Sequence, residues 1–235
     1  MLPARHAFGP RAGLSFLSTA MNEPTSKRVV AFVDGQNLFY AAKEAFGYIF
    51  PNYDISTLVP AICAQQTGWQ LVQTRFYTGV PDAGDNAHWH TFWSGKLAVM
   101  GKQGIHVFSR RLRYRNRRVR LPDGTEHTFL TGEEKGIDVR LAIDVIRLAH
   151  RGDYDVALIF SQDQDLSEVA AEIRVIAREQ HRWIKVACAF PASPARLNNR
   201  GIDKTDWIRI ERKVYDACLD RRDYRSGPHP PTPNP

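Results

Sequence analysis

The stretch Tyr154–Glu179, YDVALIFSQDQDLSEVAAEIRVIARE, joins a short apolar run to an amphipathic segment through two aspartates, Asp163 and Asp165. The run 154–161 has the length and the composition of a buried strand. The segment 166–179 repeats its apolar residues with helical spacing and predicts a helix. A buried strand that leads directly into a helix is typical of a parallel α/β sheet.

The same alternation recurs along the rest of the chain. Further strands are predicted at 28–34, 69–80, 105–109, 183–190 and 207–210, and further helices at 37–47, 55–68, 88–104 and 135–152. Short apolar strands that alternate with helices predict an α/β fold with a parallel sheet covered on both faces. We expect one domain, residues 27–222, between a flexible leader (1–26) and a disordered Pro-rich tail (223–235).

The composition narrows the functional classes. Three cysteines (Cys63, Cys188 and Cys218) lie far apart, which argues against a disulfide framework and for a reducing, cytoplasmic setting. No apolar run reaches membrane-spanning length, so we expect no membrane association. The arginine-bearing leader leaves a transit peptide open, and translation from Met1 or from Met21 is equally consistent with the sequence.

The net charge of +7 is concentrated in one segment, 109–120, SRRLRYRNRRVR, which has seven arginines and no acid. Without these seven residues the basic and acidic residues of the chain are equal in number. A local basic patch of this kind recruits polyanions, and nucleic acid is the preferred interpretation over a merely solvated hairpin.

The Arg-rich segment alternates with Leu112 and Tyr114 and passes turn signals at Asn116 and at 122–124. This pattern predicts an antiparallel excursion of two or three strands that continues through 125–130. Arginines hold phosphates in bidentate geometry, and a tyrosine can stack on an unpaired base. The predicted nucleic-acid contacts are Arg110, Arg111, Arg113, Tyr114, Arg115, Arg117, Arg118 and Arg120.

Acids gather where the predicted strands end. Asp34 closes the strand 28–34 in VDGQN, Asp163 closes the strand 154–161, and Asp165 follows in the turn. Ligands of open parallel sheets bind outside the carboxyl ends of the strands. Several carboxylates in one place repel one another unless a cation is present, and Mg²⁺ or Mn²⁺ suits such hard oxygen ligands. A site of this type can activate a water for phosphodiester hydrolysis.

A fourth acid, Asp138, lies in the first turn of the predicted helix 135–152, on a stripe whose other members are apolar. A carboxylate on a buried stripe is costly unless it is paired or metal-bound. Asp144 of the same helix has Arg140 and Arg147 at ion-pair spacing, and we interpret it as structural or surface. Glu133 and Glu134 precede the helix and are weak candidates, with a solvated loop as the alternative.

Several of these residues also have simpler interpretations. Asp165 and Glu168 fit a capping box for the helix that follows. Asn37 can cap the helix 37–47, orient Asp34 or bind a phosphate. His88 and His90 are too closely spaced for a helical metal pair. Trp89 and Trp93 most simply pack in the core, with base stacking as a weaker alternative, and Lys96 most simply is solvated.

Three motifs resemble the NYN-domain family of the PIN-like ribonuclease superfamily: FVDGQNL (32–38), EKGIDVRLAIDVI (134–146) and LIFSQDQDLSEVA (158–170). The resemblance extends over roughly residues 28–210. It implies a PIN-like three-layer fold whose parallel sheet has the order 3-2-1-4-5, so that the strands of Asp34 and Asp163 are neighbours. The family usually has glycine where this chain has Gln162, a departure that puts activity in question.

Transferred residue by residue, the resemblance implies metal-binding roles for Asp34, Asp138 and Asp163, with Asp165 as a fourth acid and Asn37 in support. It also makes Asp144 and Asp206 secondary candidates, since both match positions that are often acidic in the family.

The sequence therefore predicts a metal-dependent endoribonuclease, with Mg²⁺ or Mn²⁺ as cofactor and single-stranded or loop RNA as partner. Two alternatives stay open: an RNA-binding module whose acidic site is inactive, and a PIN-like nuclease that acts on DNA. A phosphatase of the haloacid dehalogenase type is disfavoured, because VDGQN lacks a second aspartate two residues after the first. The sequence is consistent with a monomer and with a homodimer.

Overall fold

The computed structural model describes residues 21–121, 123–195 and 200–224. Most of the predicted leader and nearly all of the predicted tail lie outside these residues. Within them, no helix combines the length and the apolar character that a membrane span requires.

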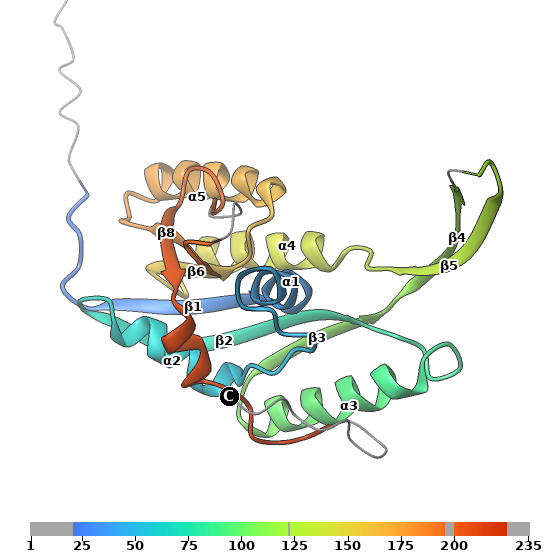
Figure 1. Ribbon diagram of the computed structural model, residues 1–235. Coiled ribbons are helices and arrows are strands. Elements are labelled where there is room, and N and C mark those ends of the chain that lie inside the picture. Colours follow the sequence, from blue (N-terminus) through green and yellow to red (C-terminus); the bar gives the residue numbers. More distant parts are fainter. Residues whose placement is uncertain (1–20, 122, 196–199, 225–235) are drawn as a thin grey trace, which may run out of the picture.

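A six-stranded parallel sheet forms the centre of the molecule (Figure 1). Its strands lie in the order β3-β2-β1-β6-β7-β8. The sheet thus has one strand more than the five implied by the family resemblance, because β8 pairs alongside β7. The strand bounds are β1 (Lys27–Asp34), β2 (Trp69–Val80), β3 (His106–Arg111), β6 (Val156–Phe160), β7 (Lys185–Pro191) and β8 (Asp206–Ile210).

Helices cover both faces of this sheet (Figure 1). One apolar core lies between one face of the sheet and the helices α1, α2, α3 and α6. A second apolar core lies between the other face and the helices α4 and α5. The helix bounds are α1 (Gly35–Phe46), α2 (Ile55–Ala64), α3 (Ala87–Lys102), α4 (Ile137–His150), α5 (Ser167–Glu179) and α6 (Arg212–Asp216), with a short 3₁₀ turn, η1 (Gln164–Leu166), before α5.

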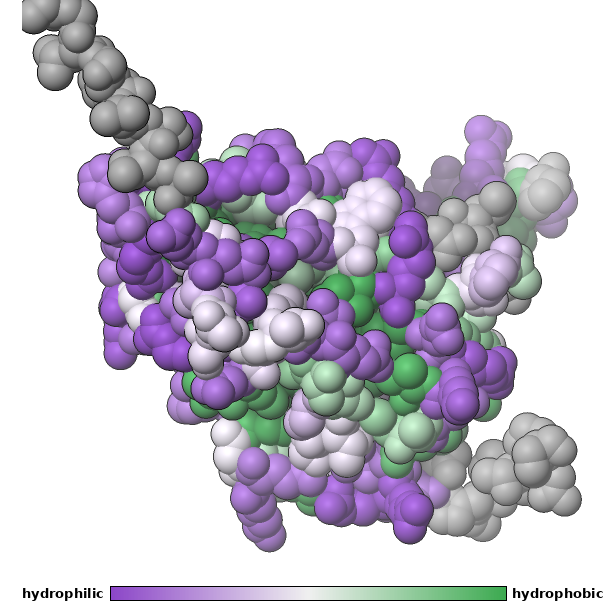
Figure 2. Space-filling model, turned by 90° about the vertical axis from the view of Figure 1, so that its left-hand side faces the viewer, coloured by the Kyte–Doolittle hydropathy of each residue, from purple (hydrophilic) through white to green (hydrophobic). Residues whose placement is uncertain are grey.

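Strand β1 shows why the sequence folds this way. Its run Val29–Val33 is at most 1% exposed, and alternate side chains enter the two cores. Such a strand is apolar without interruption because both of its faces are covered. The surface shown in Figure 2 is mostly hydrophilic, with small hydrophobic areas between the polar side chains.

Residues 109–111 of the Arg-rich segment end β3 of the central sheet, and the rest of the segment forms a separate two-stranded antiparallel hairpin, β4 (Arg113–Arg120) with β5 (Glu126–Glu133), which projects away from the body (Figure 1). Between the two strands, Leu121 N donates to the Thr125 carbonyl at 2.8 Å. The predicted turn at Asn116 is wrong, since this residue pairs with Leu130 inside the ladder. Alternation with arginine produced a strand here, and the local turn propensity of asparagine was overridden.

Candidate active site

Asp34 ends β1 and is only 9% exposed. Its side chain accepts a hydrogen bond from Asn37 N at 2.9 Å, so Asp34 is the N-cap of α1. Burial raises the pKa of Asp34 to about 6; the hydrogen bond from Asn37 acts against this shift, and the charges of Asp163 and Asp138 add to it. Asp34 is therefore a buried carboxyl close to two other acids.

Asn37 is not the cap that the sequence suggested, but it has a positioning role. Its Oδ1 accepts a hydrogen bond from Gln162 N at 2.8 Å. This contact joins the first turn of α1 to the turn that follows β6. Because β1 and β6 are neighbouring strands, with Val33 beside Phe160, the contact fixes the two acidic strand ends relative to each other.

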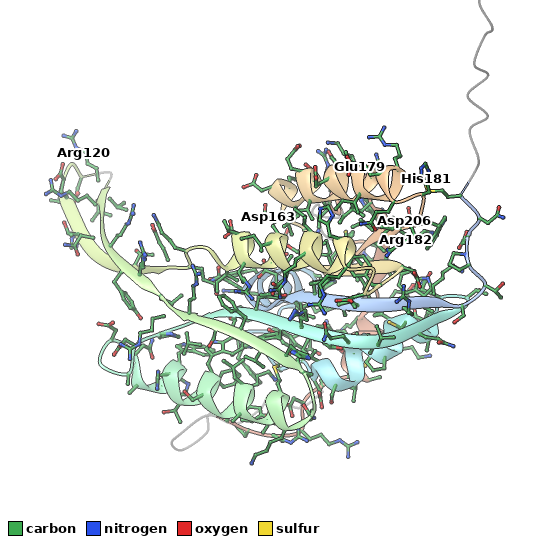
Figure 3. All side chains as sticks on the ribbon, turned by 180° about the vertical axis from the view of Figure 1, so that it is seen from behind. Arg120, Asp163, Glu179, His181, Arg182 and Asp206 are labelled. Carbon is green, nitrogen blue, oxygen red and sulfur yellow. The ribbon has the colours of Figure 1, made fainter. Side chains whose placement is uncertain are left out.

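Asp163, labelled in Figure 3, follows β6; because β1 and β6 are parallel neighbours, it lies at the same edge of the sheet as Asp34. Its side chain accepts from Asp165 N at 3.0 Å and caps η1. The expected capping box of Asp165 and Glu168 is absent: α5 begins at Ser167 without a side-chain cap. Asp165 is exposed within η1. A single turn of 3₁₀ helix shifted the start of α5 beyond the predicted capping residue.

Asp138 lies in the first turn of α4 and is exposed. The expectation that it shares the buried stripe is wrong, because Ile137, Leu141 and Val145 occupy that stripe and Asp138 is rotated away by one residue. Its charge nevertheless raises the pKa values of Asp34 and Glu134. Asp138 therefore faces the same site from outside the core.

Glu134 is the acid that sequence reasoning undervalued. It lies between the hairpin and α4, is half-buried, and accepts a hydrogen bond from Gly79 N at the end of β2. Burial raises the pKa of Glu134 to about 7, with further contributions from the charges of Asp34 and Asp138. The signal in the sequence was its spacing of four residues from Asp138 at the point where the hairpin returns to the sheet.

Asp144 is only 2% exposed, so the prediction that it lies at the surface is wrong. Its contacts support the other interpretation, a structural role. Arg140 and Arg147 bind it at 3.1 and 3.2 Å, and the Tyr77 hydroxyl donates to it at 3.0 Å. Arg75 lies 3.6 Å away. These partners neutralise Asp144 away from the strand ends.

Asp206 does not belong to the site. It begins β8, and its carboxylate pairs at 2.8 Å with Lys185, which begins β7. Since all six strands are parallel, both residues lie at the amino edge of the sheet, opposite Asp163 (Figure 3). An acid that precedes a strand is at the wrong end to join acids that follow strands.

Gln162 does not crowd the turn that carries Asp163. Its side-chain amide donates to the Arg200 carbonyl at 2.8 Å. Gln164 donates in the same way to the Gly201 carbonyl at 2.9 Å. The two glutamines thus fasten the segment at 200–203 beside the site.

The donor set fits a hard divalent cation in its chemistry: oxygen ligands only, with a carboxyl whose pKa is raised by burial and, to a smaller extent, by its acidic neighbours. In the described part of the chain, however, no three His, Cys, Asp or Glu side chains stand close enough together to hold a metal ion. The assignment of Asp34, Asp138, Asp163 and Asp165 as metal ligands therefore stays a prediction.

The end of β3 and the hairpin present their arginines to solvent. Arg110, Arg111, Arg113, Arg115, Arg118 and Arg120 are exposed, Tyr114 is half-buried, and the side chain of Arg117 lies outside the described residues. Two of them have acidic partners: Arg111 with Asp82 at 2.9 Å and Arg115 with Glu133 at 3.7 Å. Most of the positive charge on the hairpin therefore stays available to a polyanion.

A model of the NYN domain family matches residues 28–198. A search of curated proteins found no match. Among solved structures, the chain is similar to a protein of unknown function from Vibrio parahaemolyticus, at 20% identity over 82% of this chain and 98% of that chain, with a TM-score of 0.49. It is also similar to ribokinase from Giardia lamblia, at 11% identity over 74% of this chain and 50% of that chain (TM-score 0.33).

These two TM-scores are below 0.5, and the likenesses carry no argument about function. The family model spans β1, α1, α4 and β6, which carry Asp34 and Asp138 and lead into Asp163, and it covers well over half of the chain. The chain belongs to the NYN domain family of the PIN-like superfamily.

Proposed function

We propose that the protein is a metal-dependent endoribonuclease whose site lies at the carboxyl edge of the sheet. The observation that carries the proposal is the position of Asp34, a carboxyl at the end of β1 whose pKa burial raises to about 6, with smaller contributions from the charges of Asp163 and Asp138. Acids held together at the cost of mutual repulsion favour a functional role over a structural one. Membership of a family that consists generally of nucleases agrees with this interpretation.

In this proposal Asp34, Asp138 and Asp163 would hold Mg²⁺ or Mn²⁺, with Asp165 beside them. The cation would lower the pKa of a bound water and neutralise charge on the phosphate. Asn37 acts as a positioning residue, since it binds the turn that carries Asp163. Glu134, with a pKa of about 7, suits the transfer of a proton to or from a reacting oxygen near neutral pH.

The hairpin supplies the affinity for nucleic acid in the proposal. Its strands leave and rejoin the body next to the acids, because β4 follows β3 and β5 leads through Glu134 into α4. Arginine contacts to phosphates position a strand and carry little sequence information. The substrate is therefore identified by its class, single-stranded RNA or RNA loops, and not by its sequence.

The test is cleavage of an end-labelled single-stranded RNA in the presence of Mn²⁺. We expect the wild-type protein to cleave it, and EDTA or the substitution Asp163→Asn to abolish cleavage. Asp206→Asn is the matched control, since Asp206 is an aspartate at the opposite edge of the sheet and its loss should leave the activity intact. A circular RNA of the same sequence tests endonucleolytic cleavage, and a DNA oligonucleotide tests the choice of nucleic acid.

RNA binding without cleavage in any lane would reject the proposal in favour of an RNA-binding module. Equal loss of cleavage in Asp163→Asn and Asp206→Asn would show that the variants had lost their fold and not their site. In that case circular dichroism of both variants identifies the cause.

A further inference from the structure

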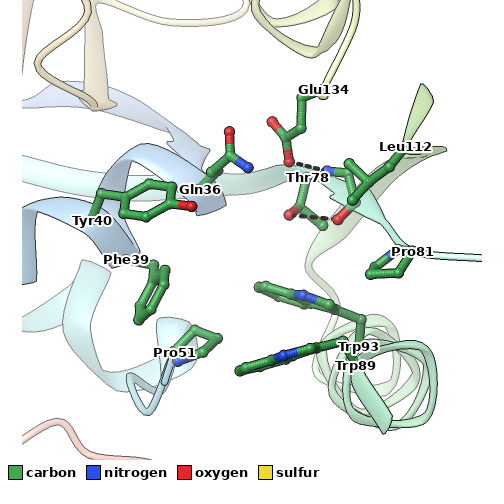
Figure 4. A pocket seen from close by; sticks show the side chains of 11 residues that line it. Gln36, Phe39, Tyr40, Pro51, Thr78, Pro81, Trp89, Trp93, Leu112 and Glu134 are labelled. Atoms are coloured by element: carbon green, nitrogen blue, oxygen red, sulfur yellow. Dashed lines mark hydrogen bonds between the residues drawn. The ribbon is translucent and has the colours of Figure 1, made fainter. Parts of the chain in front are cut away.

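A pocket with aromatic walls opens beside the acidic site, between α1 and α3 (Figure 4). Its cavity volume is about 120 Å³, which is smaller than the roughly 300–1,000 Å³ of sites for drug-sized molecules, so it has room only for a small group. Phe39 and Tyr40 of α1 line one side, and Trp89 and Trp93 of α3 line another.

The aromatic residues of this pocket are only partly used by the core. Trp93 is 8% exposed and packs on Phe76 and Phe92, as a core residue does. Trp89 also packs on Phe92, with ring centroids 5.2 Å apart, but it is only half-buried, and Tyr40 is 55% exposed. Core packing therefore does not account for the exposed faces of these two large rings, which line the same pocket.

One side of the pocket is polar. Gln36, Thr78 and Glu134 gather there, and Glu134 is held in place by its hydrogen bond from Gly79 N (Figure 4). Within the described residues the side-chain amide of Gln36 has no hydrogen-bond partner, so it can both donate and accept. Apolar walls with a few fixed polar groups at one edge match a flat heterocycle that has donors and acceptors on its rim.

The polar side of the pocket is also the side of the acids. Gln36 is two residues from Asp34 in the first turn of α1, and the charge of Asp34 affects the pKa of Glu134. Leu112, directly before β4, lines the pocket as well. The pocket therefore lies between the acidic site and the base of the Arg-rich hairpin.

We propose that this pocket receives one unpaired nucleobase of a single-stranded nucleic acid, stacked on Trp89 and Tyr40, with Gln36 and Glu134 at its polar rim. The inference rests on the proposed function and deepens it, because a base seated here would fix the adjoining phosphates relative to the acids. The exposed arginines next to the pocket favour a polyanionic strand over an apolar peptide as the occupant.

The experiment uses an oligouridylate that carries one 2-aminopurine, a base whose fluorescence is quenched by stacking. Binding to the full-length protein is measured in EDTA, so that cleavage plays no part. We expect quenching on binding, and Trp89→Ala should reduce the quenching and weaken binding on the order of tenfold. Trp89→Phe, which retains an aromatic face, should restore most of both effects.

Two further variants keep the test decisive. Tyr40→Ala changes a residue that is mostly exposed, so it probes the same pocket with little risk to the fold. Trp69→Ala is the matched control, because Trp69 begins β2 at the opposite edge of the sheet. In a fully paired duplex the 2-aminopurine is not accessible, and its fluorescence should not change with protein.

Absence of quenching, or an equal effect of Trp69→Ala and Trp89→Ala, would overturn the inference. The fate of the proposed function is read separately from cleavage with Mn²⁺. Cleavage that is unaffected by Trp89→Ala and Tyr40→Ala rejects the pocket and keeps the nuclease, whereas Trp89-dependent quenching without any cleavage keeps the pocket and rejects the nuclease.

Discussion

The Oδ1 atom of Asn37 lies 2.8 Å from Gln162 N and so connects the helix after β1 with the turn after β6. Each of these segments carries one acid, Asp34 and Asp163, and the two acids interact electrostatically. A neutral side chain thus sets the separation of two charged ones. Partners of this kind control the geometry of a site without touching the reacting atoms.

We expect Asn37→Ala to reduce the metal affinity of the nuclease by about 10–100-fold, which is typical for the loss of a group that orients ligands. A titration of cleavage against Mn²⁺ concentration measures the shift, and saturating Mn²⁺ should recover a large part of the rate. Asn37→Asp, which retains the acceptor oxygen, is the matched variant. An unchanged titration curve for Asn37→Ala would show that Asn37 has no such role.

The stability of the metal-free protein should fall as the pH rises from about 4 through 6. The pKa of Asp34 is about 6 in the folded chain against an ordinary 3.8, so the folded state binds the proton more tightly than the unfolded state. Asp34→Asn removes this cost and keeps a good N-cap for α1. We expect its thermal midpoint to exceed that of wild type by roughly 5 °C at pH 7 and to match it near pH 4.

Glu134→Gln tests the proton transfer assigned to Glu134. The wild-type rate should change with pH at or below about 7, where this carboxyl titrates, and a bound cation would move the limb to lower pH. The variant should lack that limb while it still binds RNA. A wild-type profile that persists unchanged in Glu134→Gln would assign the limb to another group.

The hairpin arginines should determine the salt dependence of RNA binding. Arg118 and Arg120 are exposed near the tip, and each contact to a single-strand phosphate contributes about 0.7 to the slope of log K against log salt. The double variant Arg118→Ala/Arg120→Ala should therefore lower the slope by roughly 1.4. Arg151→Ala, beyond the far end of α4, is the matched control and should leave the slope unchanged.

Asp144→Ala should destabilise the fold by about 3 kcal/mol, because it leaves Arg75 and Tyr77 buried without their acidic partner. Asp165→Asn changes an exposed residue and should shift the free energy of unfolding by less than about 0.5 kcal/mol. Urea unfolding of the two variants measures the difference. Similar values for both would contradict the structural role of Asp144.

The sequence predicted what depends on the order of elements. Strand–helix alternation led to the parallel α/β sheet, and the residues after two apolar runs, Asp34 and Asp163, are brought to one edge because β1 and β6 are neighbours. Parallel strands carry their carboxyl ends to the same edge wherever they lie in the chain. The position of these two acids could therefore be predicted from the pattern of strands and helices alone.

Contacts between segments that are distant in the chain could not be predicted from the sequence. Asp144 is buried because Tyr77 and Arg75 of β2, about 70 residues earlier in the chain, bind it from the face of the sheet that α4 covers. Lys96, expected in solvent, is 1% exposed because the Tyr53 carbonyl and Asp220 bind it. Glu134 owes its environment to Gly79 in the same way. Local spacing predicts only which face of a helix a residue lies on, and it was wrong by one residue at Asp138, which is exposed.

The length of the hairpin has a consequence for the size of the substrate. Each of its strands has eight residues, which corresponds to a reach of about 26 Å from the body. A strand of nucleic acid shorter than this reach can contact the acids or the far arginines but not both at once. The length of the hairpin would thus set the shortest substrate that is held at both ends. A hairpin shortened by deletion should accept shorter substrates without any change at the acids.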